Sequence, residues 1–242
     1  MIVLPVLVRP RYPGNVGAAA RVAANFAAPR LVVVAPTADL DDPDFVRMSM
    51  GAEKLVAVEA VDDLAAAVAD ADLVIGTTSA RRRDPRGLAS PEAAAERIVG
   101  TGATRVAVVF GPERSGLRKE ELARCQLLLS IPTNPTFPVL NLAQAVGIVL
   151  FALSTRPVAT PVVAEPLDRP AGDDKIQAAM AHLHDALFAS GFLDQVNSAR
   201  VMDQLRRLFG RAVLTGREVT ILRGIASHVT YLHTRGNRPK TS

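Results

Sequence analysis

Six short apolar runs, rich in β-branched residues, recur along the first part of the chain, with helix-like stretches between them. Such runs are typical of strands that are buried on both faces of a parallel sheet, where polar and apolar residues do not alternate. The sequence therefore predicts an α/β fold, a parallel sheet with helices on both faces. The predicted strands are 2–8, 31–34, 55–58, 73–77, 105–110 and 127–131, and the predicted helices are 15–27, 44–51, 62–69, 91–99, 119–124 and 141–155.

The segment 157–172 contains four prolines and no periodic pattern, which predicts an extended linker. It separates the α/β domain, residues 1–156, from a small C-terminal helical extension, residues 173–242, in which apolar residues recur at helical spacing. A helical unit of this size rarely has enough core to be stable alone, so we expect it to pack on the body or on a second subunit.

The net charge of +4 comes entirely from the extension. Residues 1–172 contain 18 basic residues (Lys and Arg) and 18 acidic residues (Asp and Glu). Residues 173–242 contain 10 basic and 6 acidic residues. A basic extension favours a polyanionic partner, although surface helices also carry extra arginines for solubility alone. We expect a cytoplasmic protein without a membrane partner or a bound metal, because no secretory signal or spanning segment is visible and Cys125 is the single cysteine.

Two segments place glycines and polar side chains directly after predicted strands. The first, 13–21, contains Asn15 and Arg21, and the second, 110–117, contains Gly111 and Glu113. Their spacing differs from the dinucleotide and P-loop motifs, which disfavours those ligands. Because the carboxyl ends of parallel strands meet at one edge, we predict a shared ligand site there. Arg21 is expected beside the helix N-terminus, where it binds phosphate; the alternative is a surface ion pair.

Two further loops carry candidate ligand residues. Thr78 and Ser79 end the strand 73–77, and the arginines that follow suit a phosphate backbone, with a solvated basic loop as the alternative. Aromatic residues that would indicate base stacking are absent from this loop. The loop 131–141 contains three prolines and leads into a helix near Asn141, whose side chain either caps that helix or reaches a ligand.

Together these motifs resemble the SPOUT class of RNA 2′-O-ribose methyltransferases, and most closely the TrmJ type. Three motifs match in order: 14–21, then 110–117 with 120–122 and Cys125, and then 131–145. The segments 202–212 and 221–225 are similar to the C-terminal helical extension of the same type. The resemblance therefore covers nearly the whole chain.

This resemblance implies a trefoil-knotted α/β domain that works as a homodimer, binds S-adenosylmethionine and methylates the ribose at position 32 of tRNA. Arg21 would be catalytic, Asn15 would lie beside the acceptor ribose, and Glu113 would orient the loop or the substrate, with Asn141 also in the catalytic set. The implied methyl-donor residues are Thr78, Ser79, Ala80, Gly111, Ile131, Val139, Leu140 and Asn141. The implied RNA-binding residues are Arg21, Arg81, Arg82, Arg83, Arg206, Arg207 and Arg211.

One residue departs from the pattern of the type. Val139 stands where serine usually precedes Leu-Asn-Leu, so a hydroxyl is missing there while main-chain contacts to the donor are retained. Two alternatives therefore stay open: a SPOUT methyltransferase for rRNA or another tRNA site such as the wobble position, and a catalytically weak RNA-binding module. The extension favours the TrmJ type, since the minimal wobble enzymes resemble the catalytic domain alone.

Overall fold

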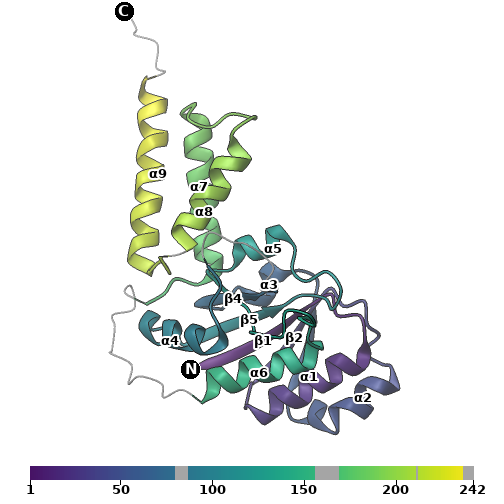
Figure 1. Ribbon diagram of the computed structural model, residues 1–242. Coiled ribbons are helices and arrows are strands. Elements are labelled where there is room, and N and C mark those ends of the chain that lie inside the picture. The colour runs from purple at the N-terminus through teal and green to yellow at the C-terminus, as the bar shows by residue number, and fades with distance from the viewer. Residues whose placement is uncertain (80–86, 156–168, 211, 237–242) are drawn as a thin grey trace, which may run out of the picture.

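The computed structural model describes residues 1–79, 87–155, 169–210 and 212–236 of the 242-residue chain. Its described part contains one all-parallel sheet in the order β3-β2-β1-β5-β4-β6 (Figure 1). The parallel sheet predicted from the sequence is confirmed. The strands are β1 (Ile2–Val8), β2 (Arg30–Val34), β3 (Ala57–Val61), β4 (Leu73–Thr77), β5 (Arg105–Phe110) and β6 (Leu127–Leu129).

Helices cover both faces of the sheet, and the strands supply side chains to a core on each side. Leu7 of β1 lies in one core, and its neighbours Val6 and Val8 lie in the other. This alternation explains the continuous apolar runs in the sequence. The first face packs against α1 (Pro13–Asn25), α2 (Pro43–Ser49), α4 (Pro91–Thr101) and α6 (Leu142–Ser154), and the second against α3 (Leu64–Val68) and α5 (Lys119–Arg124).

The largest error in the predicted strands concerns β3, which was expected at 55–58. The chain forms the 3₁₀ helix η1 (Ala52–Lys54) just before, and Leu55 is 79% exposed after it. β3 begins only at Ala57 and forms one edge of the sheet, with Glu59 exposed. An edge strand contains fewer buried apolar residues than a central strand. The apolar residues just before β3 were therefore mistaken for the beginning of the strand.

Helices α1 and α2 touch through a glycine. A Cβ on Gly17 would collide with the carbonyl oxygen of Phe45 in α2. We expect Gly17→Ala to lower the free energy of unfolding by about 1–3 kcal/mol, because packed backbone must move apart. Urea unfolding followed by circular dichroism measures this. Gly100→Ala in α4 is the control: nothing lies within 4 Å of its Cβ position, so alanine should stabilise the helix slightly, and equal losses would contradict the close-contact argument.

The extension consists of α7 (Asp173–Ala189), α8 (Ser198–Gly210) and α9 (Gly216–Gly236), which rise away from the sheet (Figure 1). Apolar residues of α7 and α9, among them Met180 and Ala226, share a small core of their own. At the base of α7, Asp173 pairs with Arg124 of α5, and its backbone N–H donates to the carbonyl of Ala71, 3.2 Å away. Burial raises the pKa of Asp173, and the Arg124 charge offsets only part of this. The extension thus joins the body beside the start of β4.

None of the helices in the described ranges is long and apolar enough to cross a membrane.

Candidate functional site

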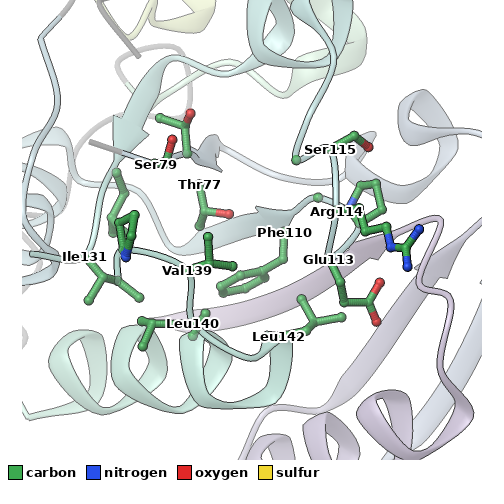
Figure 2. A pocket seen from close by; sticks show the side chains of 17 residues that line it. Thr77, Ser79, Phe110, Glu113, Arg114, Ser115, Ile131, Val139, Leu140 and Leu142 are labelled. Atoms are coloured by element: carbon green, nitrogen blue, oxygen red, sulfur yellow. The ribbon is translucent and has the colours of Figure 1, made fainter. Parts of the chain in front are cut away.

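A pocket of about 260 Å³ lies at the carboxyl ends of β4, β5 and β6. In Figure 2 the side chains of Phe110 and Val139 occupy its middle, with Ile131 on one side and Glu113 on the other. The wall combines apolar surface with a nearly equal share of polar surface, so it can bind a ligand that has both apolar and polar parts. Its described lining consists of Thr77, Thr78, Ser79, Phe110, Gly111, Pro112, Glu113, Arg114, Ser115, Gly116, Leu129, Ile131, Pro138, Val139, Leu140, Leu142 and Ala145.

A chain of side-chain hydrogen bonds joins three distant segments beside this pocket. Asn15 donates from Nδ2 to Oε1 of Glu113 at 2.8 Å, and its Oδ1 accepts from Nδ2 of Asn141 at 2.9 Å. The second carboxylate oxygen of Glu113 accepts from the backbone N–H of Arg11 at 3.2 Å. Both ends of the Asn15 amide are therefore fixed, and one predicted residue from each of 13–21, 110–117 and 131–141 meets the others here.

The sheet order explains why these segments meet. β1 pairs with β5 along its length, with Leu7 opposite Phe110, so the loops that follow the two strands leave the sheet side by side. β4 lies next to β5 and β6 lies next to β4, so the loops after them border the same region. Asn141 also caps α6, since its Oδ1 accepts from the backbone N–H of Ala143 at 2.9 Å. Capping and the contact with Asn15 are thus combined in one side chain.

An ion pair between Arg9 and Glu121 ties the loop before α1 to α5. Arg9 has a φ of 49°, an uncommon left-handed conformation for this residue type. Burial disfavours the charged carboxylate, but hydrogen bonds from Arg9 and from the backbone N–H of Arg118 outweigh it and lower the pKa of Glu121. The pair therefore fixes the beginning of 13–21 against the helix that follows 110–117.

The lowered pKa of Glu121 predicts a pH-dependent contribution to stability. A carboxyl with a lowered folded pKa stabilises the fold fully above its ordinary pKa, and this stabilisation is lost as the pH falls through the lowered value. We expect Glu121→Gln to cost about 1 kcal/mol or less at pH 7 and to make the loss of stability between about pH 5 and pH 3 shallower. Urea unfolding over this pH range measures it, and parallel curves for both proteins would contradict it.

Six of the predicted donor residues line the pocket: Thr78, Ser79, Gly111, Ile131, Val139 and Leu140. Asn141 does not line it and instead holds Asn15. Val139 is 65% exposed and stands at the pocket with no hydroxyl to offer. The predicted residues Ala80, Arg81, Arg82, Arg83 and Arg211 lie outside the described residues.

Arg21 is not where the sequence pattern was expected to place it. The helix begins at Pro13, so Arg21 lies about 12 Å along the axis from the N-terminus rather than beside it. Its side chain is exposed, and it is not among the described residues that line the pocket. Even in the predicted range 15–27 Arg21 is six residues past the first helical position, and the earlier start at Pro13 adds two more. Arg21 is exposed on the surface of the chain.

The sequence analysis assigned no site role to several lining residues, among them Phe110, Arg114 and Leu142. Phe110 is the last residue of β5, so its position at the strand end was a usable signal. Arg114 is exposed at the pocket, where it adds a cation near Glu113. Leu142 follows the capping residue of α6 and lies within the motif 131–145, but no role was predicted for its side chain.

Gly111 allows the loop 111–117 to fold tightly against the pocket. A Cβ at this position would overlap the backbone of Gly116 and Leu117. The loop therefore presents main-chain groups at one wall, while Phe110, Ile131 and Leu140 offer apolar surface. This combination suits a nucleoside with a polar tail, and the residues present fit S-adenosylmethionine. Among the described residues, no group of three or more His, Cys, Asp or Glu is arranged to hold a metal ion.

Comparisons with known proteins agree with this geometry. Residues 2–151 match the SpoU rRNA Methylase family, and residues 174–240 match the C-terminal domain of the tRNA methyltransferase TrmJ. A tRNA (cytidine/uridine/adenosine-2′-O-)-methyltransferase TrmJ from Pseudomonas aeruginosa is 36% identical over 234 residues, covering 91% of this chain and 90% of the relative.

Solved structures agree as well. The crystal structure of TrmJ from Z. mobilis superposes with a TM-score of 0.82 at 31% identity, covering 95% of this chain and 99% of that one. An AdoMet-bound rRNA methyltransferase from Sinorhizobium meliloti matches at 26% identity with a TM-score of 0.52, covering 63% of this chain and 55% of that one. The α/β fold is that of the SPOUT class, as the resemblance implied. The chain belongs to the SpoU methylase family and, within it, to the TrmJ group of S-adenosylmethionine-dependent tRNA 2′-O-methyltransferases.

Proposed function

We propose that this enzyme methylates the ribose 2′-oxygen at position 32 of tRNA, as a homodimer in the cytoplasm. Residues 1–156, with the trefoil knot that the resemblance implies, carry the chemistry, and residues 173–242 bind tRNA. The observation that carries the proposal is the hydrogen-bonded chain Asn141–Asn15–Glu113 at the edge of the pocket. It brings together the three motifs of the family resemblance at one site.

Bound S-adenosylmethionine supplies a methyl group that its sulfonium charge already activates. The protein must therefore hold the donor and align the ribose oxygen, and such alignment supplies up to roughly 7–11 kcal/mol. Thr78, Gly111 and Leu140, with the other predicted donor residues at the pocket, hold the donor. Glu113 fixes the amide of Asn15, so that Asn15 is oriented before the ribose arrives.

Arg21 binds the phosphate next to the acceptor ribose and stabilises the developing alkoxide. Arginine stays protonated, so the phosphate or a water accepts the 2′-OH proton. Within the described part of the chain no carboxylate pairs with Arg21, and its side chain is exposed. An unneutralised guanidinium is suited to bidentate phosphate binding.

In the homodimer, Arg21 of one subunit serves the pocket of the other. This assignment is supported by the outward position of Arg21 and by the packing of α1 against α6. Two large apolar side chains of α6, Ile148 and Phe151, remain exposed on the isolated protomer. Burying them in a two-fold contact would bring α1 of each subunit to the other, because the same surface is used on both sides.

Position 32 is favoured over the wobble position by the extension. The segment 174–240 matches the TrmJ C-terminal domain, whereas minimal wobble enzymes resemble only the catalytic domain. The Pseudomonas relative is named for cytidine, uridine and adenosine, so nucleotide identity at the target must be varied in the test.

The test is methylation of unmodified tRNA transcripts that carry C, U, A or G at position 32, with S-adenosylmethionine as donor and the product mapped by mass spectrometry of nuclease fragments. We expect 2′-O-methylation at position 32 alone. A transcript with a 2′-deoxyribose at position 32 is the control and should accept no methyl group. Methylation at position 34, methylation of rRNA, or donor binding without transfer would each contradict the proposal.

A further inference from the structure

A second pocket, of about 400 Å³, lies in the extension between α7 and α8, and we name it the α7–α8 pocket. It is large enough for a nucleotide-sized ligand. It is lined by residues of the extension, whose helices rise away from the sheet in Figure 1. The proposed methyl-donor pocket is instead lined by residues at the ends of the strands. Its described lining consists of His184, Phe188, Gln195, Ser198, Ala199, Met202 and Arg206.

Two rings form one wall of the α7–α8 pocket. His184 and Phe188, one turn apart on α7, stack with ring centroids 5.9 Å apart and an angle of 27° between the planes. The imidazole is held by Asp185 and by the hydroxyl of Ser198, each at 3.0 Å. Phe188 stays 43% exposed although it is a large apolar residue. A fixed, open aromatic surface is the kind on which nucleic-acid bases stack.

Arg206 supplies the cation of the α7–α8 pocket. It lies on the same face of α8 as Ala199 and Met202, whereas its neighbour Arg207 points elsewhere and pairs with Asp203 at 2.5 Å. No carboxylate in the described ranges pairs with Arg206. Gln195 adds an amide that both donates and accepts hydrogen bonds. The pocket thus combines groups for a phosphate, a base plane and a base edge.

We propose that the α7–α8 pocket binds one unpaired nucleotide of the tRNA, with its base stacked on Phe188 and its phosphate on Arg206. The inference rests on the proposed function, since it assumes a tRNA substrate. The proposal also distinguishes two arginines that the sequence analysis placed together in the RNA-binding set. Arg206 contacts RNA directly, whereas Arg207 is a surface residue that pairs with Asp203. A nucleotide outside a duplex is required, because a paired base is already stacked on its neighbours.

Matched substitutions on α8 test the phosphate contact. Binding of unmodified tRNA to the full-length protein is measured over a range of salt concentrations for Arg206→Gln and for Arg207→Gln. We expect Arg206→Gln to weaken binding about tenfold and to lower the salt slope by about one, and Arg207→Gln to change affinity about twofold or less. Equal effects of the two substitutions would overturn the assignment.

A tryptophan tests the stacking contact directly. The chain contains no tryptophan, so Phe188→Trp introduces a unique fluorophore, and Leu208→Trp on α8, away from the pocket lining, is its control. We expect tRNA to quench the emission of the Phe188→Trp variant saturably and that of the Leu208→Trp variant much less. Equal quenching, or none in Phe188→Trp, would overturn the proposal. So would a shift of Phe188→Ala to a smaller species in sedimentation, since the pocket would then be a subunit contact.

Failure of this inference is distinct from failure of the proposed function. If the wild-type protein methylates position 32 while Arg206→Gln and Phe188→Ala bind tRNA as it does, only the α7–α8 pocket is wrongly assigned. Both Arg206→Gln and Phe188→Ala should still bind S-adenosylmethionine normally, because the donor pocket shares no residue with the α7–α8 pocket.

Discussion

Replacing Arg21 by alanine is expected to lower kcat for tRNA methylation by about 10²–10³, the typical loss on removing one preorganised donor to a developing negative charge. Affinity for S-adenosylmethionine should stay unchanged, because Arg21 is not among the described residues lining the donor pocket. Single-turnover methylation gives the rate, and calorimetric titration gives the donor affinity. A parallel loss of donor affinity would contradict the separation of roles.

Arg21→Lys tests which property of arginine matters. Lysine keeps the positive charge but loses the planar pair of donors that grips a phosphate. We expect about a tenfold loss of rate, which corresponds to about one charge-assisted hydrogen bond. Near-normal turnover would show that the positive charge alone suffices. It would contradict a bidentate contact between Arg21 and the phosphate.

Gly111→Ala is expected to weaken S-adenosylmethionine binding by about 5- to 150-fold. The new methyl group would overlap the backbone of Gly116 and Leu117, and opening such a packed contact costs about 1–3 kcal/mol. Calorimetric titration of the donor measures the effect. Gly224→Ala in α9 serves as the control, with little expected change, because nothing lies within 4 Å of its Cβ position and it does not line the pocket. Unaltered donor binding in Gly111→Ala would mean that the loop does not form part of the donor site.

The two impaired variants together test whether the site is shared between subunits. The donor concentration is kept too low to fill the Gly111→Ala pocket. If Arg21 serves the partner's pocket, a dimer of one Arg21→Ala and one Gly111→Ala subunit then has one working site. Random exchange should restore about a quarter of wild-type activity, since about half of the dimers are mixed and each has one working site of two. Mixtures that stay inactive, despite proven subunit exchange, would place Arg21 at the pocket of its own subunit.

Much of the fold follows from residue pattern, because buried parallel strands have a distinctive apolar signature. The central strands β1, β4 and β5 were predicted within a residue of their bounds, whereas the exposed edge strand β3 was displaced. The knot is implied only by the family resemblance and stays a prediction. The order of the strands could not be predicted, because β1 and β5 are neighbours in the sheet but lie far apart in the sequence.

The pocket at the strand ends was predicted from residues that end strands, and most of the predicted donor residues line it. What pattern could not supply was the orientation of side chains on helices. From the sequence, Asn141 could equally cap a helix or contact a ligand. In the structure its side chain caps α6 and donates a hydrogen bond to Asn15. Arg206 and Arg207 are adjacent in sequence, but their separation of about 100° around a helix gives them different surroundings.

The pairing of β1 with β5 also determines when the site can form during synthesis. Val6 and Val109 lie opposite each other, so the first strand lacks its central neighbour until more than one hundred further residues have been made. Closing so long a loop slows folding, because the chain loses conformational entropy before the contacts between β1 and β5 form. A nascent chain that ends before α6 lacks Leu142 and Ala145 of the pocket lining, so the pocket at the strand ends is complete only when the whole α/β body has been made.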